Sequence, residues 1–324
     1  MMSRYFQRIA IIGALALLAP AVALAQQPYP SRDIHFILAF PPGSGSDTTV
    51  RFLAEKMRPI VKATIVVENK PGASGVLAAE YVARSKPDGY TIFVHAGNTM
   101  ASIKHLYKKP PFEPAEAMQV AATINKQAFM IVVDAKSPYK TLGDLTAALK
   151  AKGEKATYGA SANIALIMGA MYRELAGLKA VDVTYRSGPE TLNDLASGTL
   201  DFAVHDPILA LAQQDQGRVR ILGVGSKERL QSAPQLPTMA EQGVPVDLQS
   251  WFAALVPAAT PKSVVNQINA WFNQVVATDE ARIFLNKFGT DPWISTPEEG
   301  QAQMLRDLEK WPDYIRIAKL QPLG

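Results

Sequence analysis

The side chains of this chain that are best suited to bind or react with a ligand lie in a loop rich in glycine and serine, Phe40–Asp47. The loop follows an apolar β-rich run and precedes a stretch, Val50 to Val61, whose apolar residues recur at helical spacing. A loop in this position presents the unpaired N–H groups and the positive dipole end of the helix, and such junctions bind anions. Because the loop holds no Lys or Arg, we expect a carboxylate rather than a triphosphate. Its candidate binding residues are Phe40, Ser44, Gly45 and Ser46.

A second junction of the same kind occurs at Ala156–Asn163, where Ser161 and Asn163 supply hydrogen-bonding groups ahead of another amphipathic stretch. Two helix N-termini that face each other across a cleft would hold a carboxylate without a formal positive charge. Each dipole contributes roughly 0.3–1 kcal/mol, so the affinity would be modest. The structural alternative is that Asp47 and Ser161 only cap their helices.

Two of the four histidines, His95 and His205, end predicted strands, which is where open α/β sheets bind their ligands. Asp206 follows His205, and Pro207 then suits the first position of a helix. We therefore add His95, His205 and Asp206 to the candidate ligand-binding residues. The histidines show no metal-ligand spacing and the chain has no Cys, so we expect no metal and no cofactor.

Enzymatic motifs are incomplete. The segment from Gly159 to Asn163 approaches a nucleophile elbow, but Asn163 stands where the second glycine belongs. A serine hydrolase would use Ser161 with His205 as its base and one acid from Asp182, Asp194 or Asp201. We keep this hydrolase as an alternative and expect no catalytic residues.

Strand-like and helix-like patterns alternate, which predicts an α/β fold with mainly parallel sheets. The predicted strands are 35–40, 64–68, 91–95, 120–124, 129–133, 156–159, 181–185, 202–205, 221–224 and 252–256. Ten strands are many for one sheet and no linker separates consecutive domains. We therefore predict two lobes that share the chain discontinuously, 26–125 with 248–324 and 126–247, around a cleft. The lobes would close about crossing strands near Ile124 and Trp251.

The N-terminus indicates export. Arg4 and Arg8 precede an apolar run and an Ala23-Leu24-Ala25 cleavage signal, so we predict a signal peptide over 1–25 and a periplasmic mature protein. The formal charge of +4 and the absence of a later Lys/Arg cluster argue against nucleic-acid binding.

Several segments then resemble the Bug receptors, the extracytoplasmic solute-binding proteins of tripartite tricarboxylate transporters. The resemblance rests on Tyr29–Arg32, the Phe40–Asp47 loop, Val67–Gly75, Pro87–Thr91 and further matches in order, which are Leu106–Pro110, Val183–Arg186, Pro237–Glu241 and Ser250–Phe252. It implies a clamshell fold of the periplasmic-binding-protein type, no catalysis, a small organic carboxylate as ligand, and two integral membrane subunits as partners. We expect a monomer. A binding protein that presents its ligand to a membrane sensor remains a second alternative.

Two departures from the family pattern bear on specificity. The second loop continues as Ala162-Asn163-Ile164-Ala165, with fewer donors than usual, and His205 replaces the usual phenylalanine before Asp206. These changes favour an aromatic acid or a dicarboxylate. If His205 contacts the ligand, dicarboxylate affinity should rise as the pH falls from about 8 to 6.

Overall fold

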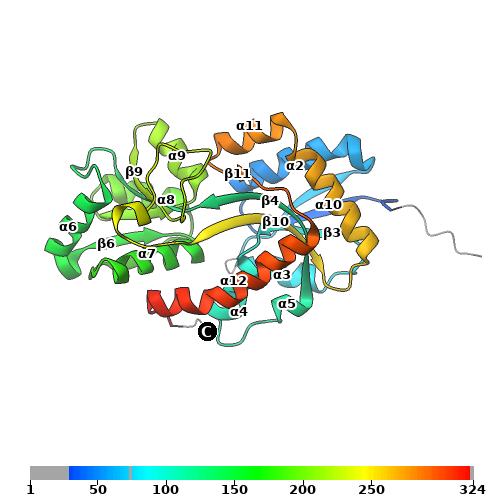
Figure 1. Cartoon of the computed structure of the whole chain (residues 1–324), viewed down its shortest axis with the longest axis horizontal. Coiled ribbons are helices and arrows are strands. Elements are labelled where there is room, and N and C mark those ends of the chain that lie inside the picture. The colour runs from blue at the N-terminus through cyan, green and yellow to red at the C-terminus, as the bar shows by residue number, and fades with distance from the viewer. Residues whose placement is uncertain (1–28, 73–74, 322–324) are drawn as a thin grey trace, which may run out of the picture.

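The computed structural model describes residues 29–72 and 75–321, and the predicted signal peptide lies outside the described residues. Two sheets carry the fold, and helices cover both of them (Figure 1). The larger sheet has six strands in the order β11-β4-β10-β3-β1-β2. Its strands are β1 (Ile34–Leu38), β2 (Ile65–Asn69), β3 (Thr91–Ala96), β4 (Met118–Ala128), β10 (Gln249–Pro257) and β11 (Asp291–Pro292).

The smaller sheet has five strands in the order β7-β6-β8-β5-β9. Its strands are β5 (Met130–Asp134), β6 (Thr157–Ala160), β7 (Val181–Thr184), β8 (Phe202–His205) and β9 (Val219–Val224). In each sheet every pairing that involves the crossing strands β4, β5 or β10 is antiparallel, whereas β1–β3 and β6–β8 pair in parallel. The two-lobed α/β fold is confirmed. The sheets are mixed rather than mainly parallel, because the chain enters and leaves each lobe in opposite directions.

The helices of the larger sheet are α2 (Gly45–Val61), α3 (Val76–Ala83), α4 (Thr99–Leu106), α5 (Pro114–Ala117), α10 (Lys262–Val276), α11 (Asp279–Lys287) and α12 (Pro297–Ala318). Those of the smaller sheet are α6 (Leu142–Lys152), α7 (Asn163–Leu175), α8 (Gly188–Ala196) and α9 (Pro207–Asp215), with short 3₁₀ turns at 153–155 and 240–242. In α2 the predicted periodic face is the buried face. Thr141 and Asp144 form a capping box that opens α6.

The chain passes between the sheets at two extended crossings. Phe129 alone separates β4 from β5, and β10 returns to pair with β4 from Gln249 opposite Ala128. The outward crossing therefore lies a few residues beyond Ile124. Both crossings border the carboxyl ends of neighbouring strands, since Met130 pairs with His205 and Phe252 pairs with Ala96.

Helix α12 is a third connection. Met304 packs in the core beneath the larger sheet, whereas Trp311 and Ala318 pack with α7 in the core of the smaller sheet. Figure 1 shows the same helix running from one lobe toward the other. Pro312 interrupts it and, lacking an N–H, cannot donate to the carbonyl of Leu308. That oxygen instead accepts a hydrogen bond of 2.7 Å from His105 Nε2 on α4.

This replacement can be tested by a double-mutant cycle. His105→Phe should lower the free energy of unfolding by about 1–3 kcal/mol, because it leaves a partly buried carbonyl without a donor. In a Pro312→Ala background, where a backbone N–H is restored, the same substitution should cost about 1 kcal/mol less. Urea unfolding of the wild type, the two single variants and the double variant measures the coupling free energy between the two substitutions. Equal costs in both backgrounds would show that His105 does not substitute for the missing N–H.

Candidate functional site

The first loop is organised by its helix. Ser44 is the N-cap of α2, and its Oγ accepts a hydrogen bond of 3.2 Å from the Asp47 N–H. Asp47 sits one turn inside, where Oδ2 accepts the Gly43 N–H at 2.8 Å and Arg51 Nε at 3.0 Å. The cap is therefore Ser44 rather than Asp47, and the Asp47 carboxylate bonds the N–H of Gly43, the residue before the cap.

Asp47 is 3% exposed, and its Oδ1 also accepts the amide of Asn69 at 2.8 Å. Burial pushes the pKa of Asp47 upward, but the hydrogen bonds from Arg51, Gly43 and Asn69 outweigh it and hold the pKa below its ordinary value. The carboxylate is ionised and compensated by Arg51. The junction thus offers a ligand neither a free cation nor a free anion.

Two other residues of the loop face away from this network. The Ser46 hydroxyl is partly exposed and hydrogen-bonded to none of the described residues. Gly45, the first residue of α2, lies against Ile208 of α9, which belongs to the other lobe. A β-carbon at position 45 would overlap with Ile208 Cγ2 and Cδ1. Glycine here allows the two lobes to approach closely.

The second junction also contacts the opposite lobe. Helix α7 begins at Asn163 with Ala162 as its N-cap, so the predicted cap role of Ser161 is wrong. The Asn163 amide donates to Ser102 Oγ of α4 at 2.9 Å. Ser161 is half-buried beside Gly188, where a β-carbon would lie 3.7 Å from its Oγ. Ser161 is thus the unoccupied donor of this loop, since no described residue accepts its hydroxyl.

His205 is buried and held by its own lobe. Thr191 donates its hydroxyl to the Gly188 carbonyl at 2.7 Å, so His205 Nε2–H donates to Thr191 Oγ1 at 2.9 Å. Burial lowers the pKa of His205 to about 4. Burial thus keeps the imidazole neutral from pH 8 to 6, which weighs against the pH dependence of dicarboxylate affinity, and that dependence stays a prediction. Asp206 is the N-cap of α9 and accepts the Leu209 N–H at 3.0 Å, and burial raises the pKa of its carboxyl.

His95 lies at the carboxyl end of β3 and is 3% exposed. The rings of Phe40, Phe93 and Phe252 lie 4.6, 4.7 and 6.0 Å from the imidazole, centroid to centroid. Nδ1 is buried and has no hydrogen-bond partner. Burial lowers the pKa of His95 to about 3, so this ring is neutral as well.

A third strand–helix junction lies at the same edge of the larger sheet, and the sequence analysis missed it. Asn98 is the N-cap of α4, and Thr99 and Ser102 lie at the start of that helix; all three are buried polar residues. Ser250 of β10 donates to Asn98 Oδ1 at 3.1 Å, and Gly97 N–H donates to the Trp251 carbonyl at 2.8 Å. The sequence signal for this junction was the run Gly97-Asn98-Thr99, which follows the predicted strand 91–95 after one residue.

The geometry does not form a hydrolase triad. Each acid that could orient His205 is engaged elsewhere in the described chain. Asp182 pairs with Arg173 at 3.5 Å, Tyr185 donates to Asp194, and Asp201 accepts Lys152 at 2.7 Å and the Thr157 N–H at 2.8 Å. His205 Nε2 bonds a threonine instead of a carboxylate.

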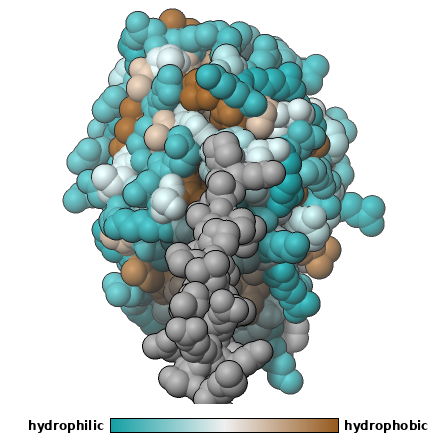
Figure 2. Space-filling view, turned by 90° about the vertical axis from the view of Figure 1, so that its right-hand side faces the viewer, coloured by the Kyte–Doolittle hydropathy of each residue, from teal (hydrophilic) through white to brown (hydrophobic). Residues whose placement is uncertain are grey.

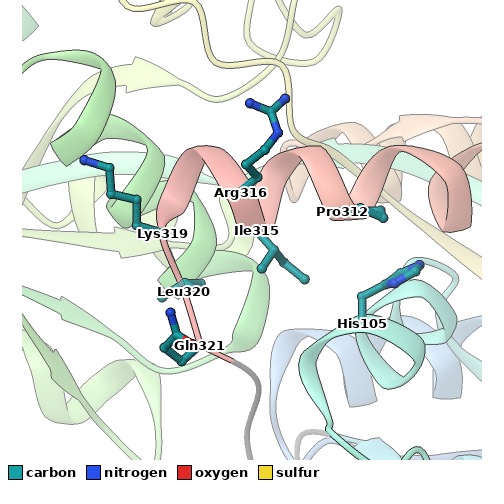
Figure 3. A pocket seen from close by; sticks show the side chains of 7 residues that line it. All are labelled: His105, Pro312, Ile315, Arg316, Lys319, Leu320 and Gln321. Carbon is teal, nitrogen blue, oxygen red and sulfur yellow. The ribbon is translucent and has the colours of Figure 1, made fainter.

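Other surface features lie away from these junctions. A hollow of about 600 Å³ opens between α4 and the end of α12 and is lined by His105, Pro312, Ile315, Arg316, Lys319, Leu320 and Gln321 (Figure 3). None of these is a predicted ligand residue. Figure 2 shows that the visible surface at the end of the larger lobe is mostly hydrophilic with small separate apolar patches. Within residues 29–72 and 75–321 no three His, Asp or Glu side chains gather as a metal site would need, and no helix could cross a membrane.

Comparisons with known proteins agree with this architecture. The family model described as tripartite tricarboxylate transporter family receptor (TctC) matches residues 49–320. BugT of Bordetella pertussis is 25% identical over 95% of this chain and 96% of its own length. The structure of the periplasmic binding protein BugD covers 90% of this chain and 99% of BugD, with 26% identity and a TM-score of 0.81. The structure of R. palustris Rpa4515 with adipate covers 91% of this chain and 100% of Rpa4515, with 24% identity and a TM-score of 0.85.

The family model and the structure of BugD agree that two α/β lobes of this kind form a solute-binding protein. The chain belongs to the family of tripartite tricarboxylate transporter receptors, which confirms the resemblance to the Bug receptors.

The buried His205 predicts a specific dependence of stability on pH. Its pKa is about 4 in the folded protein and about 6.5 when unfolded, so below pH 6.5 protons bind the unfolded chain preferentially. Stability is therefore lost as the pH falls from 6.5 toward 4. Between pH 7.5 and 5 the wild type should lose roughly 2 kcal/mol more than His205→Phe.

Urea unfolding of both proteins at the two pH values measures this difference. The comparison with the variant is necessary because Asp307, whose pKa burial raises to about 6, acts in the opposite direction in both proteins. An equal loss in both proteins would mean that His205 titrates normally.

Proposed function

We propose that this protein is a periplasmic receptor that captures a small organic carboxylate between its lobes and delivers it to a tripartite tricarboxylate-type transporter. The observation that carries the proposal is that the N-termini of α2 and α7 each contact the opposite lobe, with the uncommitted hydroxyls of Ser46 and Ser161 beside them. Family membership supports the receptor role. The adipate in Rpa4515 shows that a neighbour of the same fold holds a carboxylate.

The ligand residues proposed for the larger lobe are Phe40, Ser44, Gly45, Ser46 and His95, and those for the smaller lobe are Ser161, Asn163, His205 and Asp206. Ser46 and Ser161 are the strongest of these because their hydroxyls are uncommitted. Ser44, Asn163, His205 and Asp206 already bond the protein, so we assign them mainly to shaping the site.

The lobe boundaries at residues 125–126 and 247–248 remain part of the proposal, as do the signal peptide over 1–25 and a monomeric state. Two integral membrane subunits are the proposed partners. Presentation of the loaded receptor to a membrane sensor would use the same site, and a pull-down of membrane proteins with the loaded receptor separates the two. His205 bonds Thr191 instead of a carboxylate, which weighs against a hydrolase that would use Ser161.

A thermal-shift screen of the mature protein against organic acids tests the central claim. A ligand at 100 times its dissociation constant should raise the free energy of unfolding by about 2.7 kcal/mol. Carboxylates should shift the transition, whereas the corresponding amides and alcohols should not. If no carboxylate stabilises the protein, the proposed function fails.

Ser46→Ala should weaken carboxylate binding by roughly 1–3 kcal/mol, because a donor aimed at a desolvated oxygen is lost. Calorimetry with the best ligand of the screen measures the change. Ser44→Ala is the contrasting variant, since it removes the N-cap of α2 and should lower stability by about 1 kcal/mol instead. Unchanged affinity in folded Ser46→Ala would move the carboxylate away from α2.

Closure can be tested at the contact between Gly45 and Ile208. Gly45→Ala inserts a methyl group between α2 and α9 and should weaken ligand binding by roughly 1–3 kcal/mol, because overpacking holds the lobes apart. Adding Ile208→Ala to the same chain should restore the affinity. Calorimetry gives the affinities, and small-angle scattering with ligand should give a larger radius of gyration for Gly45→Ala alone.

The matched control is Gly143→Ala, which lies in the first turn of α6, where the nearest atom is 3.6 Å from the new β-carbon. This variant should bind like the wild type. Wild-type affinity in Gly45→Ala would show that the closeness of α2 and α9 does not matter for binding.

A further inference from the structure

Beyond the junctions that hold the carboxylate, the larger lobe contains a cluster that needs an explanation. His95, Phe40, Phe93 and Phe252 pack together at the carboxyl ends of the strands, and we call them the aromatic wall. Phe40 is partly exposed and directly precedes the loop of α2, so the wall adjoins the proposed carboxylate grip. A ligand whose carboxylate is bound at the N-terminus of α2 would extend along this wall.

The imidazole is the unusual member of the wall. A buried polar atom without a partner costs about 1–3 kcal/mol, and buried polar groups are nearly always paired. His95 Nδ1 is such an atom. The ring also lies close to Gly75, where a β-carbon would be 3.0 Å from Nε2 and where a φ of +95° favours glycine. A core position would be filled more stably by phenylalanine, so the nitrogen atoms indicate a role in binding.

Among the described residues, no Lys or Arg side chain lies over a ring of the aromatic wall. The neutral Thr99 lies with the His95 imidazole around Gly75, and Ser102 further along α4 is bonded by Asn163 from the other lobe. Arg51, the basic residue nearest the loop in sequence, is paired with Asp47. The faces of aromatic rings carry partial negative charge and repel anions. A second carboxylate placed here would be desolvated without a counter-charge, which is costly.

We propose that the aromatic wall selects monocarboxylates with a flat, uncharged body that carries a hydrogen-bonding group, in preference to dicarboxylates. The carboxylate lies at the α2 and α7 junctions, the ring of the ligand lies against the partly exposed Phe40, and the imidazole of His95 bonds the uncharged substituent. This inference rests on the proposed function and names the substrate class of the same site.

Calorimetry with four probes tests it: benzoate, 4-hydroxybenzoate, cyclohexanecarboxylate and adipate. The wild type should bind 4-hydroxybenzoate about tenfold more tightly than benzoate, and both aromatic acids more tightly than adipate. Cyclohexanecarboxylate, which is apolar but not flat, should bind more weakly than benzoate. His95→Phe should remove the preference for the hydroxyl group and leave the benzoate affinity nearly unchanged.

His35→Phe is the matched control, because His35 lies on β1 of the same sheet but pairs with Glu68 at the partly exposed surface. It should bind all four probes like the wild type. Adipate binding as tightly as 4-hydroxybenzoate, or a hydroxyl preference that survives His95→Phe, would overturn the inference and leave the carboxylate receptor standing. The order of the four affinities in the wild type tests the inference even if His95→Phe does not fold. If none of the probes and no other carboxylate binds, the proposed function falls together with this inference.

Discussion

The two extended crossings between the sheets are the constraint on which the rest of this structure depends. One chain builds both sheets, and it passes from β4 to β5 with a single residue between them before it returns along β10. The crossing strands pair beside the carboxyl ends of β3 and β8, opposite Ala96 and His205. The ends of strands from both lobes, with the helix N-termini that follow them, are therefore brought to the border between the lobes. A hinge placed there can change the separation of the junctions without disturbing either core.

At these strand ends the protein avoids uncompensated charge. Asp47 is ionised but paired with Arg51, and His95 and His205 are kept neutral by burial. The groups that remain available are hydroxyls and the positive ends of helix dipoles, each of which contributes about a kcal/mol or less to anion binding. In the proposed receptor such a site would gain its affinity from closing around the ligand, and the contacts of Gly45 with Ile208 and of Asn163 with Ser102 join the two lobes beside it. Release would then require only that the lobes separate.

Much of this was predictable from local sequence. The two strand–loop–helix junctions and the alternation of strand-like and helix-like segments are local patterns, and the structure contains them. What could not be predicted depends on partners distant in sequence. The burial of His205 and its bond to Thr191 became visible only in the fold, and so did the engagement of Asn163 by Ser102 from the other lobe. The mixed pairing of the sheets follows from the crossings, which no local pattern encodes.

Helix α12 restricts how the two lobes can move relative to each other. It packs in both cores, so the lobes cannot open about the strand crossings without strain in this helix or sliding along α7. Pro312 places a weak point between the two halves, and His105 supplies the hydrogen bond that the proline removes. The opening motion should therefore be limited and directed, with α12 bending near Pro312 while each half keeps its own packing. A receptor built in this way closes along one path, which suits a ligand site whose donors come from both lobes.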